Sequence, residues 1–279
     1  MVSFQSNWPD IRSNFLEYLK LKQLNERYAQ DMLSYLDKYV SVIRGPMDVV
    51  RVFSALTAGR QHHLNRAVRN VFNFLEAQGY CKDWLDLLRK NIPKEEVGFD
   101  VNVPSAEMIV ASLRVMSEAC LKYRALYALV VDSGPRLVEA VRLINGFDEL
   151  KVERFDGFVV VPLGYFRRSK LAYFAFMTDA TFRLVEQVKE EIDWESAVTY
   201  VRKHTGVVAF KYLRKFANDT TTSEELNIPE STADFIQGRT AKSVGARHYM
   251  QLKRKAIQFY PRYAKYVTEL RRKAGLIPA

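Results

Sequence analysis

The stretch FVVVPLGYFRRSKLAYFAFM, residues 158–177, decides the fold because it predicts two β-strands in a chain otherwise patterned for helices. Its two flanks, 158–163 and 171–177, are rich in β-branched and aromatic side chains, and a polar turn at 167–170 separates them. Such runs on either side of a short polar segment are typical of a β-hairpin. We therefore expect a small antiparallel sheet at this point of the chain.

Apolar residues at helical spacing surround this hairpin on both sides. They predict a helical bundle over the first hundred residues and further helices at 104–116, 120–134, 178–192, 207–222 and 229–239. The periodicity breaks between Lys94 and Ala106, a stretch that contains Gly98 and Pro104. The sequence thus predicts a mainly α protein with a small antiparallel β-sheet: a helical domain over 1–98, a linker over 99–106 and a second domain over 107–279.

The net charge of +10 over 279 residues is concentrated at the end of the chain. Residues 251–279 carry eight basic and one acidic side chains, interleaved with Phe259, Tyr260, Tyr263 and Tyr266. A basic surplus of this kind suits an anionic partner, most commonly a nucleic acid. The alternative is a solvated helix face above buried tyrosines.

Several classes of protein are excluded or disfavoured by the sequence. Two cysteines are too few for a disulfide framework or a Cys-rich zinc module, and the histidines have no partners at metal-ligand spacing. The chain has no GxxxxGK[ST], GxGxxG, HExxH or GxSxG motif. It shows neither a signal-peptide pattern nor an apolar run that could span a membrane. We expect a cytoplasmic protein without a membrane anchor, a metal or another cofactor.

Two segments place basic side chains at turns. SGPRLVEA, residues 133–140, carries Arg136 directly after a Gly-Pro pair and Glu139 three residues later. The hairpin turn reads RRSK and ends at Lys170.

Two further segments follow in the second half of the chain. KYLRK carries Lys211 and Arg214, whose spacing of three residues puts them on one helix face. IQGRTAKSVGARHYM carries Arg239 and, ten residues later, Tyr249.

Taken in order, these segments resemble the catalytic domain of tyrosine recombinases, the phage-type integrases. That family has an Arg in a G-x-R-x-x-E turn, a Lys in a β-hairpin, an H/K-x-x-R helix, a G-H/W turn and a Tyr nucleophile. SGPRLVE, KYLR and QGR match three of these motifs, and the order and separations agree over roughly residues 107–250. Lys211 and Arg239, which replace the more usual residues, make the chain most similar to integrases of archaeal viruses and plasmids.

The resemblance implies a site-specific DNA recombinase that cleaves and rejoins DNA through a covalent 3′-phosphotyrosine. It implies a core-binding role for the N-terminal domain, a double-stranded attachment site as partner, and a tetramer assembled on DNA from free monomers. The implied catalytic residues are Arg136, Lys170, Lys211, Arg214, Arg239 and Tyr249, with Glu139 orienting Arg136. The basic residues expected to contact DNA are Arg167, Arg168, Lys215, Lys242, Arg247, Lys253 and Arg254.

The residue types suit this chemistry on their own account. Arginines can hold the non-bridging oxygens of a phosphodiester with two fixed donors each. A tyrosine, with an ordinary pKa of about 10, is a weak nucleophile unless cations stabilise its phenolate. A lysine in a hairpin can protonate the leaving 5′-oxygen.

Each assignment has a simpler alternative. Arg136 could merely pair with Glu139, Lys211 could be a solvated helix residue, and Arg239 could be a cation at a helix end. Either arginine of the hairpin turn could replace Lys170 at the phosphate. The tail tyrosines compete with Tyr249, although they lie too far along the chain for the family pattern, and we interpret them as amphipathic packing plus DNA contact.

Two other functions also remain open. One is DNA relaxation of the type IB topoisomerase kind, and the other is a catalytically silent, architectural DNA-binding protein. The tail after Tyr249 could be exchanged between protomers or pack on its own domain.

Overall fold

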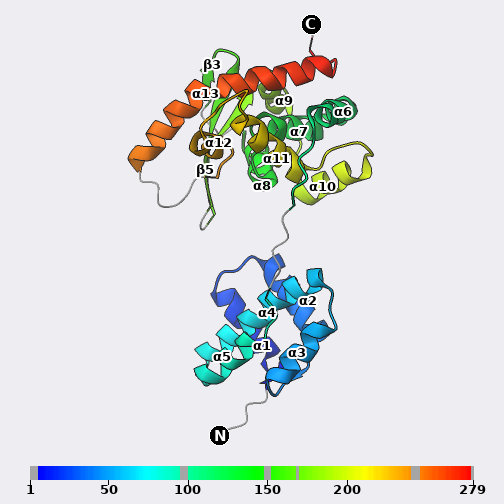
Figure 1. The fold of residues 1–279 in the computed structure, drawn as a ribbon, viewed down its shortest axis with the longest axis vertical. Coiled ribbons are helices and arrows are strands. Elements are labelled where there is room, and N and C mark those ends of the chain that lie inside the picture. Colours follow the sequence, from blue (N-terminus) through cyan, green and yellow to red (C-terminus); the bar gives the residue numbers. More distant parts are fainter. Residues whose placement is uncertain (1–5, 95–99, 148–151, 168–169, 240–245, 278–279) are drawn as a thin grey trace. The chain divides into compact units, whose positions relative to one another are not determined.

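The computed structural model describes residues 6–94, 100–147, 152–167, 170–239 and 246–277. The chain forms two compact units, Met1–Asp100 and Val101–Ala279 (Figure 1). Each unit has its own hydrophobic core, and each is described separately below.

The first unit is a helical bundle. Its helices are α1 (Trp8–Leu21), α2 (Glu26–Tyr39), α3 (Pro46–Ser54), α4 (Ala58–Ala77) and α5 (Lys82–Lys90). The longest of them, α4, buries Leu64, Val68, Phe72 and Leu75 along one face, as their helical spacing predicts. Two strands of two residues each, β1 (Ser6–Asn7) and β2 (Val42–Ile43), pair antiparallel. They escaped the sequence analysis because two residues are too few to show an alternating pattern.

The second unit surrounds a small sheet with helices (Figure 1). The helices are α6 (Ala106–Ser117), α7 (Leu121–Ser133), α8 (Leu137–Asn145), α9 (Asp179–Gln187), α10 (Trp194–Lys203), α11 (Phe210–Thr222), α12 (Glu230–Ile236) and α13 (Ala246–Lys273). Helix α8 was predicted only as a turn around Arg136, and helix α10 was not predicted from the sequence. Helix α10 starts at an Asp193 cap and buries Ala197 and Val201, so its apolar signal is weak. In the part of the chain that the structure describes, no helix is long and apolar enough to cross a membrane.

The sheet of the second unit has three antiparallel strands in the order β3 (Glu153–Phe155), β4 (Phe158–Arg167) and β5 (Lys170–Thr178). Strands β4 and β5 are the predicted hairpin, and their register shifts between Pro162 and Tyr165. Proline has no N–H to give to the ladder, which suits it to such an irregularity. The predicted fold class, mainly α with a small antiparallel sheet, is confirmed.

Helix α7 is the centre of the second unit. Every residue from Ala125 to Ser133 is buried, so the helix is apolar on almost all sides and its sequence shows little amphipathic periodicity. It ends at Gly134, which adopts the left-handed conformation with φ of 60°. An added Cβ at Gly134 would come within 2.8 Å of the Cβ of Ala217 in α11, so both the turn and the close packing require glycine.

Candidate functional site

Arg136 is the last residue of the turn between α7 and α8. It caps α8, and its own backbone N–H donates to Oε2 of Glu139 at 2.9 Å. Its guanidinium Nη1 donates to Oε1 of Glu139 at 2.7 Å and to the carbonyl of Gly238 at 2.6 Å. The Glu139 side chain is 3% exposed and that of Arg136 26% exposed. A buried carboxylate therefore holds an arginine that still reaches the surface.

Arg214, from α11, joins this turn to a second one. Its Nη1 donates to the carbonyl of Gly134 at 2.5 Å and to that of Gln237 at 2.7 Å. Gly134 lies two residues before Arg136, and Gln237 lies two residues before Arg239. One guanidinium thus fixes the two turns that carry the other arginines.

Arg239 follows the end of α12. Its backbone N–H donates to the carbonyl of Asp234 at 2.8 Å, and its guanidinium lies 3.9 Å from the Asp234 carboxylate. The preceding residue, Gly238, has a φ of 65°, and a Cβ there would lie 2.9 Å from the Cβ of Ala172 and 3.2 Å from Oε2 of Glu139. The close approach of α8, α12 and β5 at this point needs a residue without a side chain.

The three arginines repel one another electrostatically. Burial, together with the charges of Arg239 and Arg136, lowers the pKa of Arg214 to about 9. Burial also lowers the pKa of Arg239, with Arg136 adding to the effect and Asp234 opposing it. A cluster of half-buried cations, in which the pKa values of Arg214 and Arg239 are lowered, is a favourable place for an anion.

Lys211 lies one turn before Arg214 on α11, and its side chain is exposed with Nζ 5.3 Å from the centre of the Tyr212 ring. Arg136, Lys211 and Arg214 share the lining of a pocket of about 610 Å³, whose other walls are mostly apolar. Within the described residues, no group of three or more His, Cys, Asp or Glu side chains could hold a metal ion.

The model of the archaeal phage integrase family matches residues 101–266, more than half of the chain. The chain belongs to this family. The resemblance predicted from the sequence is confirmed, and membership makes the chain an integrase, a protein that recombines DNA. Comparison with curated proteins found no match.

The matched range of the integrase includes the three arginines and Tyr249. The backbone of Tyr249 is in the first turn of α13, and that of Lys170 begins β5. The side chains of both, and those of Arg167 and Arg247, lie outside the described residues. Arg168 and Lys242 lie outside them entirely.

The remaining basic residues expected at DNA differ in how they are engaged. Nζ of Lys253 pairs with both carboxylate oxygens of Glu153, at 2.6 and 2.8 Å, and its side chain is 14% exposed. Nζ of Lys215 donates to the carbonyl of Asn102 at 3.3 Å. Arg254, next to Lys253 on α13, is exposed.

The tail tyrosines of the integrase are mostly not at its surface. Tyr260 and Tyr263 are completely buried, so the expectation that these two contact DNA is wrong, while the expectation of packing is confirmed for them. Tyr266 is partly buried against the same core. In this structure the tail packs on its own unit, along one face of α13.

Sequence reasoning missed the backbone carbonyls that assemble the site. The carbonyls of Gly134 and Gln237 each accept a hydrogen bond from Arg214, and that of Gly238 accepts one from Arg136. The only sequence signal for them is the glycine in GPR and in QGR, which marks a turn but not its partner.

Proposed function

We propose that this integrase is a site-specific tyrosine recombinase that cuts and rejoins double-stranded DNA. The observation that carries the proposal is the bridge made by Arg214 between the Gly134 and Gln237 carbonyls. It gathers arginines from α11 and from the starts or ends of α8 and α12 around one position. Three positively charged guanidiniums brought close together are suited to a phosphodiester, on which negative charge grows during the reaction.

In the proposed reaction, Tyr249 gives up its phenolic proton to water and its Oη attacks the phosphorus of the DNA backbone. A bond from the tyrosine oxygen to phosphorus forms, the bond to the 5′-oxygen breaks, and Lys170 gives that oxygen its proton. The product is a 3′-phosphotyrosine and a free 5′-hydroxyl. Attack by the 5′-hydroxyl of another strand reverses these steps, so a phosphodiester is exchanged without an energy source.

The other site residues act on the phosphate. Arg136, Arg214 and Arg239 hold its non-bridging oxygens, and Glu139 positions Arg136 through the two bonds described above. Lys211, which lines the same pocket as Arg136 and Arg214, adds a further positive charge near the reacting groups.

DNA binding would use both units of the chain. We assign core DNA binding to the helical domain 1–98, joined through 99–106 to the catalytic domain 107–279. The expected backbone contacts are Arg167, Arg168, Lys215, Lys242, Arg247, Lys253 and Arg254. Four copies would assemble on a pair of attachment sites, from monomers in the absence of DNA.

The test is covalent trapping on nicked duplexes. A pool of nicked duplexes with randomised sequence is incubated with the full chain, and covalent complexes are selected under denaturing conditions. Mass spectrometry then maps the attached residue. We expect attachment at Tyr249, its loss in Tyr249→Phe, and unchanged DNA binding by that variant.

A matched control is Tyr266→Phe, which changes a partly buried tyrosine of the same helix and should leave trapping intact. An adduct that persists in Tyr249→Phe would exclude Tyr249 as the nucleophile. A wild type that forms no adduct on any duplex would favour the silent architectural protein. Relaxation of supercoiled plasmid without recombinant product would instead favour topoisomerase-like activity.

A further inference from the structure

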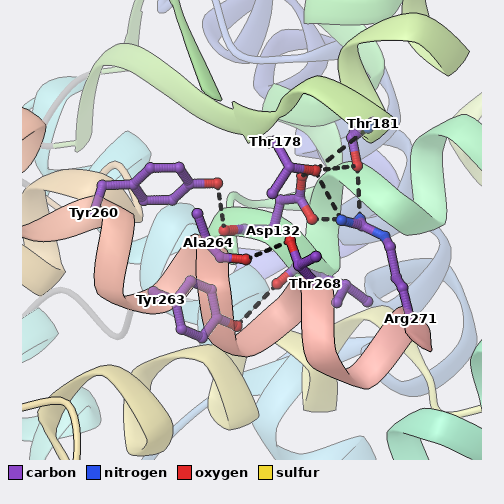
Figure 2. A network of polar contacts seen from close by, with 9 residues as sticks. Asp132, Thr178, Thr181, Tyr260, Tyr263, Ala264, Thr268 and Arg271 are labelled. Carbon is purple, nitrogen blue, oxygen red and sulfur yellow. Dashed lines mark hydrogen bonds and ion pairs between the residues drawn. The ribbon is translucent and has the colours of Figure 1, made fainter. Parts of the chain in front are cut away.

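The end of α7 is tied to the middle of α13 by two buried tyrosines (Figure 2). The hydroxyl of Tyr260 donates to the carbonyl of Asp132 at 3.0 Å, and that of Tyr263 donates to the carbonyl of Val131 at 2.9 Å. Carbonyls in the last turn of a helix have no partner within the helix. Side chains of α13 therefore provide bonds that α7 cannot make itself.

The same few residues of α7 continue directly into the arginine site. The N–H of Gly134 donates to the carbonyl of Val130, and the carbonyl of Gly134 accepts from Arg214. Arg136 follows two residues later. Hydrogen bonds thus fix Val131, Asp132, Gly134 and Arg136, and two of these bonds come from α13.

The helix that makes these bonds also carries Tyr249. It runs from Ala246 to Lys273 and contains Pro261, which has no N–H to donate to the carbonyl of Ile257; Tyr260 lies just before this proline and eleven residues after Tyr249. At 1.5 Å per residue, the two positions are separated by about 16 Å along the helix axis. Tyr249 and Tyr260 lie in the part of α13 that precedes Pro261, so a shift or rotation at Tyr260 is transmitted along this part to the backbone of Tyr249, while Tyr263 holds the helix directly after the proline.

The tyrosine hydroxyls are permanent donors at ordinary pH. Burial raises the pKa of Tyr260 and of Tyr263 well above the usual value, and the charge of Asp132 adds to this effect while that of Arg271 opposes it. Both rings are held in the core, where Tyr260 packs against Phe158 and Phe176. The two bonds are thus constant features of the folded domain.

We propose that Tyr260 and Tyr263 are positioning residues, whose hydroxyls set the helix that carries Tyr249 in register with the turn that presents Arg136. The proposal rests on the proposed function, because register matters only if Tyr249 attacks a phosphate held by the arginines. Displacement of a reacting group by about 1 Å can cost about 100-fold in rate. Loss of the two hydroxyls therefore slows cleavage while leaving DNA binding in place.

The test compares Tyr260→Phe, Tyr263→Phe and the double variant with Tyr127→Phe. Tyr127 is an equally buried tyrosine of the same unit, and its hydroxyl donates at 3.0 Å to the carbonyl of Val208 rather than to an element joined to α13. All four changes keep the aromatic ring. The measurements are the single-turnover rate of adduct formation with protein in excess, the Kd for the same duplex, and the Tm.

For the double variant we expect a fall in adduct rate of roughly 10- to 100-fold, with the Kd changed by less than about 2-fold. The Tyr127→Phe control should lose Tm by a similar amount per hydroxyl yet keep its adduct rate, since its bond does not involve α13. An adduct rate in the double variant equal to that of the control would overturn the positioning role alone. A wild type that forms no adduct would overturn the proposed function and the positioning role with it.

Discussion

Replacing Arg271 with leucine should destabilise the second unit strongly, because Arg271 is the charged partner of a fully buried carboxylate. Its Nη2 pairs with Oδ1 of Asp132 and donates to Oγ1 of Thr181 at 2.7 Å, and its Nη1 donates to Oγ1 of Thr178 at 2.7 Å (Figure 2). The side chains of Arg271 and Asp132 are 5% and 0% exposed. Leucine would leave the carboxylate buried with only the two bonds from Thr178 that the structure gives its other oxygen.

Removal of one partner from a buried ion pair costs about 3–5 kcal/mol. For a domain of this size, each kcal/mol lowers the Tm by about 2–4 °C. Together these figures predict that Arg271→Leu lowers the Tm of the second unit by about 6–20 °C. Calorimetry of the full chain measures this shift.

The neighbouring residue provides a matched control. Arg272 pairs with Glu269 at the surface, where the two side chains are 46% and 44% exposed. Exposed pairs of this kind contribute about 0–1 kcal/mol, so Arg272→Leu should lower the Tm by no more than about 4 °C.

A second variant tests the cause of the loss. In Asp132→Asn/Arg271→Leu the uncompensated buried charge is gone, so the double variant should regain part of the Tm that Arg271→Leu loses. Equal Tm values for Arg271→Leu and Arg272→Leu would refute the reasoning, as would a double variant no more stable than Arg271→Leu.

Three further outcomes follow from the site. Gly238→Ala should lower the free energy of unfolding by about 1–3 kcal/mol and abolish adduct formation. The φ of Gly238 is 65°, and the new Cβ would lie 2.9 Å from the Cβ of Ala172 in β5. The control Gly59→Ala, with open space around its Cβ, should keep its free energy of unfolding in denaturant titrations. Inorganic phosphate should raise the Tm at neutral pH and lose this effect as the pH rises above about 9. The pKa of Arg214 is lowered to about 9, so above this pH Arg214 gives up the charge that binds the anion. The Tm of Arg214→Gln should not respond to phosphate at either pH. Arg254→Met should weaken DNA binding and reduce its salt dependence more than Lys253→Met, because Lys253 is already paired with Glu153; equal losses in a filter-binding titration would contradict this.

Local features of the fold were predictable from the sequence. The hairpin at 158–177 follows from its strand-forming runs and polar turn, and the start of α8 follows from Gly134-Pro135 before Arg136. The contact between Arg136 and Glu139 is also local, because residues three apart at a helix start are neighbours.

The assembly of the site was not predictable in the same way. The sequence orders the arginines but does not indicate that the carbonyl of Gly238 receives Arg136, from which it is separated by 102 residues. Nor does it reveal β1 and β2, which are too short for a pattern, or α10, whose buried face is narrow.

The basic tail illustrates what each level decided. By itself the sequence determined that the surplus charge lies after Tyr249 and that apolar residues recur there at helical spacing. The sequence counts Arg271 and Lys253 in the basic surplus of the tail. Only the tertiary structure decided that they form ion pairs with Asp132 and Glu153. The physical reason is that periodicity specifies which face of a helix is buried, whereas the charge that compensates a buried cation comes from a segment 100 or more residues away, brought near only by packing.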